Sequence, residues 1–540
     1  MKLLLTTLNS KFIHSNLAIK YLYAQAMQEV PELCRNVTMT EFTINNEYSY
    51  VYGEILRGKY DVVCFSCYIW NIEQIKGLCE DLKKAQPNLL IVLGGPEVSY
   101  DAKAFLAKHQ WVDIIIKGEG ERTFTELLKA FQEVAAGTVC TENCELAKSA
   151  ADGSQRDILA SLLDEKLSGI GSLVYRNKSG CMISETLNYP LPAMENIAFP
   201  YEYIDVEKDK VIYYEASRGC PYRCSYCLSS IDKSVRVLPA EETKKQLDFF
   251  LARNVKQVKF IDRTFNCDKD RAYDIWEYLI RNDNGTTNFH FEICAEIIEE
   301  KHLELLKNAR EGLFQFEIGI QSANSQVLSE IDRSPKTEKL FENVRRLIAM
   351  KNSHIHVDLI AGLPYEDFDS FRESFNSVYA LEADNLQLGF LKVLCGTKMH
   401  EKREKYNIVY RNKAPYEIIS NKFISPLEVA RLKMVENVLD LYHNKGGFAE
   451  STTFLISKEK SAFDFYDNLA EFFYREGFQH RSHKKEDLYR ILLKYVSEKT
   501  NLGMCSDDFY DWAKELIEKD LRETMNFDAV KKFMRKGWDI

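Results

Sequence analysis

The chain has 540 residues, of which 45% are hydrophobic and 28% are charged, a composition typical of a globular protein rather than a disordered or fibrous one. Its length predicts about two to four domains, which excludes a minimal binding module. The net charge of -10, from 71 basic and 81 acidic residues, gives no global positive field, so neither nucleic acid nor an anionic membrane is an expected partner.

The amino terminus lacks the pattern of an export signal. The apolar run at residues 3–5 is too short for a secretory signal, and no segment approaches the roughly 18 apolar residues of a membrane span. We therefore expect a cytoplasmic protein in which the 14 cysteines stay reduced. Clustered thiols in that compartment more often bind metal or take part in catalysis than form disulfides.

Residues 1–135 alternate short β-rich runs with amphipathic helical stretches. This alternation predicts a parallel, doubly wound, Rossmann-like sheet, in which ligands bind beyond the carboxyl ends of the strands. Glycines at two of those ends, in residues 94–95 and 118–120, would let a bulky ligand lie against the backbone. Cys64 and Cys67, at a third strand end, are interpreted as buried core residues rather than ligands. The strands are predicted at residues 2–6, 37–42, 60–66, 88–93 and 112–116.

The regular alternation stops between residues 136 and 204. Mixed polar sequence and a hairpin pattern at residues 173–180 are followed by Pro190, Pro192 and Pro200. These features predict an interdomain linker with a small β element.

Six further strands alternate with helices between residues 205 and 400. Such units predict a partial, TIM-like (β/α)6 barrel with its active site at the carboxyl ends of the strands. Residues 401–540 are charged and amphipathic and predict an α-helical domain. The fold class is therefore α/β, with a helical domain at the carboxyl end. The barrel strands are predicted at residues 211–215, 258–261, 289–293, 314–318, 356–360 and 386–393.

The strongest chemical motif follows the first strand of this barrel. Cys220, Cys224 and Cys227 stand at C-x3-C-x2-C spacing in one short loop, where their thiolates can converge on one inorganic cluster. Iron–sulfur clusters commonly take four thiolates, so three would leave one iron open to a small chelating ligand. A structural zinc site is the alternative, but such sites usually use four ligands in two pairs, and no second pair follows at zinc-finger distance.

This motif resembles that of the radical SAM superfamily, and the resemblance covers residues 205–400. It implies a 4Fe-4S cluster on the three cysteines and reductive cleavage of S-adenosylmethionine to a 5'-deoxyadenosyl radical. It also implies a small-molecule substrate and an electron donor such as flavodoxin or ferredoxin. In such an enzyme the cofactor carries the difficult chemistry and the protein orients it.

The resemblance also implies contacts to S-adenosylmethionine at later strand ends. Asp262 lies where the family places a loop for the methionyl amino group, although the usual Gly-Gly-Glu form is absent. Glu296, Glu317 and Gln321 have the polarity needed for ribose or amino groups, and Gly362 would let the backbone approach adenine. Taken alone, each of these residues is more often part of a salt bridge or a turn.

The first domain is similar to the cobalamin-binding domain that precedes the barrel in one branch of this superfamily. The similarity implies that residues at three strand ends hold cobalamin. The D-x-H-x-x-G loop that supplies a histidine to cobalt is missing, and His14 lacks that setting. The domain could therefore bind cobalamin without a histidine ligand, or could have kept the fold and lost the cofactor. The implied contact residues are Ser66, Tyr68, Gly94, Gly95, Gly118 and Glu119.

These resemblances predict a cobalamin-dependent radical SAM methyltransferase that acts on an unactivated carbon or phosphorus centre. The alternatives are a cobalamin-dependent cyclase or rearrangement enzyme, and a non-catalytic iron–sulfur sensor or assembly protein. RNA methylthiolation is disfavoured because no basic RNA-binding module is evident at the carboxyl end. That end resembles an uncharacterised helical domain of such proteins, which identifies no substrate.

Overall fold

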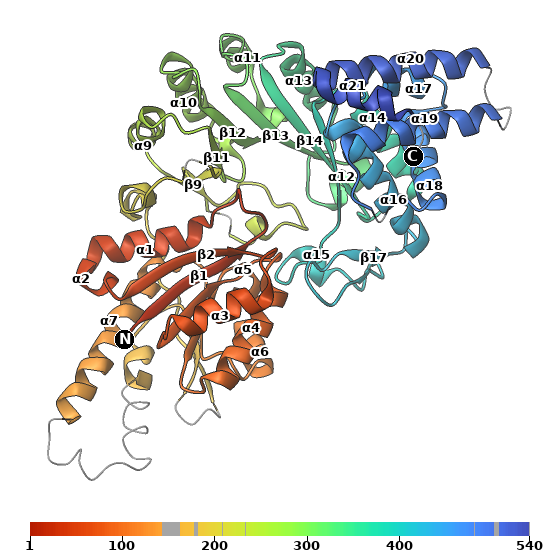
Figure 1. The fold of residues 1–540 in the computed structure, drawn as a ribbon. Helices are drawn as coiled ribbons and strands as arrows, with labels where there is room; N and C mark the ends of the chain where they lie inside the picture. Colours follow the sequence, from red (N-terminus) through yellow and green to blue (C-terminus); the bar gives the residue numbers. More distant parts are fainter. Residues whose placement is uncertain are drawn as a thin grey trace.

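The computed structural model describes residues 1–142, 163–177, 182–207, 209–232, 234–479, 481–501 and 507–538. In chain order it contains a first sheet with flanking helices, a second sheet with flanking helices, and a helical end (Figure 1). Much of the predicted linker, at residues 143–162, and the turn of the predicted hairpin, at 178–181, lie outside the described residues. Within the described residues, no helix is both long enough and apolar enough to cross a membrane.

The first sheet has the strand order β2-β1-β3-β4-β5-β6-β7, and β1 to β5 are parallel. Leu3 and Leu5 of β1 pack in one core with α1 and α7, whereas Leu4 and Leu8 pack on the opposite face with α3 and α4. Both faces are therefore covered by helices, which confirms the predicted doubly wound sheet. The elements are β1 (Leu3–Asn9), α1 (Leu17–Glu29), α2 (Pro31–Cys34), β2 (Val37–Thr43), α3 (Tyr48–Arg57), β3 (Val62–Ser66), α4 (Ile72–Ala85), β4 (Leu90–Gly94), α5 (Pro96–Ser99), α6 (Ala102–Lys108), β5 (Ile114–Ile116) and α7 (Glu121–Glu142).

The β element predicted within the linker joins this first sheet. β6 (Leu173–Arg176) pairs antiparallel with β5, and β7 (Ile183–Glu185) pairs antiparallel with β6. The Arg176 side chain donates hydrogen bonds to the carbonyl oxygens of Val112 and His109. The segment therefore covers the β5 edge of the sheet.

The second sheet has six parallel strands in the order β15-β14-β13-β12-β11-β8 and does not close on itself. The predicted partial barrel is thus confirmed, with β8 and β15 as its two edges. Large aromatic side chains such as Phe260, Phe291 and Phe316 lie in the core between this sheet and its helices, where Phe291 and Phe316 contact the Trp276 ring. The elements are β8 (Ile212–Tyr214), α9 (Ala240–Ala252), β11 (Gln257–Phe260), α10 (Lys269–Arg281), β12 (Asn288–Ile293), α11 (Glu300–Leu306), β13 (Phe314–Gln321), α12 (Ser325–Glu330), α13 (Glu338–Ala349), β14 (Ser353–Ala361), α14 (Phe368–Tyr379) and β15 (Asn385–Phe390).

The helical end packs against the barrel and shares its hydrophobic core. Figure 1 shows the helices from residue 426 onward, α16 to α21, at the side of the barrel that is remote from the first sheet. Phe463 meets Phe375 of α14 edge to face, with ring centroids 5.4 Å apart. A π-helical turn places Asn444 beside edge strand β15, where its side-chain amide donates to the Leu386 carbonyl oxygen and accepts from the Leu386 N–H, both over 3.0 Å. The elements are α15 (Lys398–Glu401), β16 (Val409–Tyr410), β17 (Ile418–Ser420), α16 (Pro426–Leu439), α17 (Ala449–Ile456), α18 (Ala462–Arg475), α19 (Lys485–Asn501), α20 (Asp507–Thr524) and α21 (Phe527–Lys536).

Candidate functional site

The loop that carries the three motif cysteines follows the first barrel strand, β8. The antiparallel pair of β9 (Ser217–Arg218) and β10 (Arg236–Val237) joins the two ends of this loop. Gly219 begins the loop with a φ of +96°, and a Cβ atom there would lie 1.8 Å from the carbonyl oxygen of Ser234. Only glycine allows the two ends of the loop to pack this closely.

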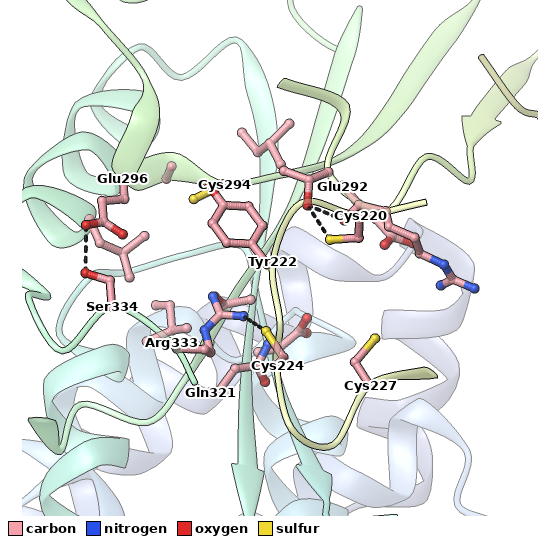
Figure 2. A pocket seen from close by; sticks show the side chains of 18 of the residues that line it. Cys220, Tyr222, Cys224, Cys227, Glu292, Cys294, Glu296, Gln321, Arg333 and Ser334 are labelled. Carbon is pink, nitrogen blue, oxygen red and sulfur yellow. Dashed lines mark hydrogen bonds between the residues drawn. The ribbon is translucent and has the colours of Figure 1, made fainter. Parts of the chain in front are cut away.

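Cys220, Cys224 and Cys227 line one cavity of about 240 Å³, whose walls include the carboxyl ends of β12 and β13 (Figure 2). All three are free thiols; Cys220 and Cys224 are buried and Cys227 is half-buried. The sequence motif therefore brings three potential metal ligands to one cavity. Among the described residues, no three His, Cys, Asp or Glu side chains are grouped closely enough to hold a single metal ion.

Arg333 reaches this cavity from the loop after α12. Its guanidinium donates toward Cys224 Sγ over 3.7 Å and to the Gly319 carbonyl oxygen over 2.6 Å (Figure 2). Burial raises the pKa of the Cys224 thiol, and the Arg333 charge opposes this rise. Arg333 thus favours the thiolate form that a metal ligand requires.

Gln321 has the side chain best suited to bind a ligand in the same cavity. It ends β13 with a φ of +73°, is 8% exposed, and its Oε1 atom has no hydrogen-bond partner within the described structure. A buried acceptor left without a partner fits a ligand that brings an N–H or O–H group, as the amino and ribose groups of S-adenosylmethionine do.

Glu296 and Glu317, also predicted as S-adenosylmethionine contacts, line the cavity but already have partners. Glu296 accepts a hydrogen bond from Ser334 over 2.8 Å. The Glu317 carboxylate lies 3.0 Å from Lys259 Nζ and 3.1 Å from His290 Nε2. Although burial alone would raise it, these two partners hold the pKa of Glu317 well below its usual range, so Glu317 is ionised at neutral pH.

Asp262 and Gly362 do not line this cavity, contrary to the sequence-based expectation. The buried Asp262 carboxylate accepts hydrogen bonds from the Ala216 backbone N–H over 2.9 Å and from Ser217 Oγ over 2.6 Å. It therefore fixes the chain just before the cysteine loop. A Cβ atom at Gly362 would lie 2.9 Å from the Ile418 side chain, so Gly362 packs against the β17 segment instead of a ligand.

A second cavity, of about 620 Å³, lies at the carboxyl ends of β3, β4 and β5. All six residues predicted to contact cobalamin line it. Gly95 has a φ of +101°, and a Cβ atom there would lie 2.4 Å from the Cys67 carbonyl oxygen. The Tyr68 ring stacks on Trp70 with centroids 4.5 Å apart. Glycine backbone and the Tyr68 ring are thus part of the cavity lining, which fits a large, flat, partly apolar group such as a corrin. The six residues are Ser66, Tyr68, Gly94, Gly95, Gly118 and Glu119.

His14 does not lie where a ligand to cobalt would have to lie. Its Nδ1 atom lies 2.7 Å from the hydroxyl of Tyr213 in the first barrel strand. It does not line the second cavity. His14 therefore helps to join the first domain to the barrel.

A network of ion pairs connects the first domain to the cysteine loop. Arg218, two residues before Cys220, contacts Glu119 and Glu121 of the first domain over 2.6 Å each, and Glu215 over 2.7 Å. Arg236 pairs with Glu119 from the other end of the loop. Glu119 thus lines the second cavity and also anchors the loop. The side chains of these residues are 10 to 23% exposed.

Arg263 and Arg333 are candidate site residues that the sequence did not single out. Arg263 lies in the loop after β11 and Arg333 in the loop after α12, and basic residues in loops are too common to attract attention. One signal could have identified Arg263: it follows the barrel strand β11, and the loops at the carboxyl ends of barrel strands form the active site.

Comparisons with known proteins match three segments of the chain. The model of the B12 binding domain matches residues 3–128, that of the radical SAM superfamily residues 214–378, and that of a protein of unknown function (DUF4080) residues 404–538. The cysteine-lined cavity lies within the radical SAM segment, and most residues that line the second cavity belong to the B12-binding segment.

Among curated relatives, the cobalamin-dependent radical SAM methyltransferase TokK of Streptomyces tokunonensis is 25% identical over 64% of this chain and 49% of its own length. The 2-(S-pantetheinyl)-carbapenam-3-carboxylate methyltransferase of Streptantibioticus cattleyicolor is 25% identical over 60% of this chain and 45% of its own length. The chain therefore spans about half the length of these relatives. Among solved structures, the radical S-adenosylmethionine methyltransferase TsrM of Kitasatospora setae matches with a TM-score of 0.54 at 16% identity, over 77% of this chain and 76% of its own, a likeness of fold.

Proposed function

Since the chain belongs to the radical SAM proteins that carry a cobalamin-binding domain, we propose that it is an enzyme that methylates an unactivated carbon or phosphorus centre of a small molecule. The family's cofactors are a 4Fe-4S cluster, S-adenosylmethionine and cobalamin. When bound, they supply a carbon-centred radical and a transferable methyl group.

The observation that carries this proposal is the position of the two cavities on opposite sides of one loop. The loop after β11 contributes Ile261 and Arg263 to the corrin-sized cavity, and Arg263 and Thr264 to the cysteine-lined cavity. Radical formation and methyl donation must reach the same substrate atom, so two neighbouring sites are what this chemistry requires.

The chain's own residues have three tasks in this scheme. Cys220, Cys224 and Cys227 would hold the cluster, and Arg333 would stabilise the thiolate form of Cys224. Gln321, with its free acceptor, would orient S-adenosylmethionine. The residues that line the second cavity would hold the corrin and exclude water from its face. An external reductant such as flavodoxin or ferredoxin would supply the electron.

Anaerobic reconstitution tests this assignment. We expect wild-type protein to bind four irons and a corrin per chain, to cleave S-adenosylmethionine, and to form S-adenosylhomocysteine in the presence of substrate. The variant with Cys220, Cys224 and Cys227 all changed to Ala should lose the iron and the cleavage. Cys395→Ala is the matched control, because this exposed thiol lies outside the cysteine-lined cavity.

Three other results would count against the proposal. Cleavage that survives in the triple alanine variant would refute the cluster assignment. Formation of 5'-deoxyadenosine without S-adenosylhomocysteine would instead indicate a cyclase or rearrangement enzyme. Bound iron with no cleavage of S-adenosylmethionine would indicate a sensor or assembly protein.

A further inference from the structure

Arg263 is the one residue that the linings of the two cavities have in common. If the proposed function holds, the substrate must be reached from both cavities, because one supplies the radical and the other the methyl group. A substrate in that position lies beside Arg263. The identity of this side chain therefore bears on what the substrate is.

The backbone of Arg263 is held from both sides. Its neighbour Asp262 is 0% exposed, with both carboxylate oxygens occupied by Ala216 and Ser217. Its other neighbour, Thr264, is 7% exposed, and its Oγ1 atom contacts Cys220 Sγ at 3.6 Å. The loop is thus held in place next to the cluster ligands, and the exposed Arg263 side chain projects from it.

The Arg263 guanidinium has no hydrogen bond or ion pair to any described residue, and the residue is exposed. Arg218 and Arg333, two other arginines near the cysteine loop, are by contrast bound to carboxylates or to Cys224 and a carbonyl oxygen. A cation in a cavity wall whose five N–H donors are unused within the described structure is available to a ligand.

The charge of Arg263 acts on both cavities. On the barrel side, burial raises the pKa of Glu292 to about 7, and the Arg263 charge opposes this rise. On the side of the first domain, burial raises the pKa of Tyr68, and Arg263 again opposes the rise. The guanidinium thus lies near an ionisable group of each cavity, as its place in both linings requires. The nearby carboxylate of Glu317 is already neutralised by Lys259.

We propose that Arg263 binds an anionic group, a carboxylate or a phosphate, on the substrate and so sets the substrate class. The planar guanidinium fork matches both groups with two parallel charge-assisted hydrogen bonds. Such a contact fixes orientation as well as affinity, which a substrate shared between two sites requires. The carboxylate of S-adenosylmethionine itself is the competing source of the same chemistry.

Site-resolved modification with phenylglyoxal, read by peptide mass spectrometry, tests this proposal. Arg223 is the matched control, because it is an exposed arginine in the same cysteine loop that lines neither cavity. In protein loaded with S-adenosylmethionine, inorganic phosphate or citrate at about ten times its dissociation constant should slow modification of Arg263 about tenfold, because only the unoccupied guanidinium reacts. The rate for Arg223 should not change. Equal reactivity of Arg263 with and without these anions would overturn the proposal.

Equilibrium dialysis of S-adenosylmethionine separates the two sources of the anion. For Arg263→Gln we expect the dissociation constant to change less than about twofold, whereas loss of a charged contact to the cofactor would weaken it about tenfold. A tenfold loss, or full protection of Arg263 by S-adenosylmethionine alone, would assign the contact to the cofactor and refute a substrate role. If the protein binds no iron or corrin, the proposed function fails, and footprinting of the purified protein with phosphate still decides whether Arg263 is an anion site.

Discussion

Arg218→Gln should weaken the connection between the first domain and the cysteine loop. Arg218 faces three carboxylates, and its own side chain is only 12% exposed. Removing one partner of a buried ion pair costs about 3 to 5 kcal/mol because the other charge remains buried. Arg236 still faces Glu119 in the variant, whereas Glu121 and Glu215 are left uncompensated. We therefore expect the free energy of unfolding to fall by about 3 kcal/mol, at the lower end of this range.

The pH dependence gives the same prediction an independent check. In the wild type, burial alone would raise the pKa of Glu121, but Arg218 holds it below its usual value. Glu121 therefore stabilises the folded state above the unfolded pKa, and this contribution is lost as pH falls through the lower folded pKa. Without Arg218, burial raises the folded pKa above the unfolded one, which penalises the fold at neutral pH. The difference in the free energy of unfolding between the variant and the wild type should therefore become smaller as pH falls from about 7 to about 5.

Urea denaturation, followed by tryptophan fluorescence at each pH, measures the free energy of unfolding of the variant and of the wild type. Arg223→Gln is the control, since it removes the same charge from an exposed position in the same loop. The double variant Arg218→Gln with Glu121→Gln should regain part of the loss, because one orphaned carboxylate is gone. The reasoning is refuted if Arg218→Gln shifts the midpoint no more than Arg223→Gln, or if the double variant is less stable than the single one.

Three further substitutions test local features. Gly95→Ala should destabilise the protein by at least about 2 kcal/mol and lower its corrin content, because φ is +101° and the new Cβ would lie 2.4 Å from the Cys67 carbonyl oxygen. Gly118→Ala, with open space around the Cβ, should cost only about 1 kcal/mol in the same denaturation assay, and equal losses would contradict the packing argument. Glu366 is 1% exposed, and burial raises its pKa to about 7, so wild type should lose about 3 kcal/mol relative to Glu366→Gln as pH rises from about 4.5 to 7. Parallel stability curves for these two proteins would show that Glu366 does not titrate in this range.

The two sheets were predictable because their short β-rich runs alternate with amphipathic helices along the chain. The pairing of β6 with β5 could not be predicted, because local periodicity identifies a strand but not the strand with which it pairs. The same limit applies to the site. The C-x3-C-x2-C spacing places three thiols in one loop regardless of the surrounding fold, so it could be read directly.

Asp262 shows where reasoning from the sequence stops. A carboxylate at a strand end can face a ligand or can bind the N–H and O–H groups of a neighbouring loop, and sequence does not distinguish the two. In the structure Ala216 and Ser217 occupy it. The roles of Arg263 and Arg333 also depend on the fold, because it is the fold that brings Arg263 to both cavities and Arg333 to Cys224. No pattern along the chain reveals either position.

The contact between Asn444 and β15 has a consequence for how the chain can be divided. A parallel edge strand presents unpaired N–H and C=O groups that can recruit another strand and lead to aggregation. The Asn444 amide occupies both groups of Leu386 at that edge, as a neighbouring strand would. The segment from 404 to 538, which matches a family of unknown function, thus covers this edge at Leu386, and we expect a barrel expressed without it to leave the edge open to pairing with another strand.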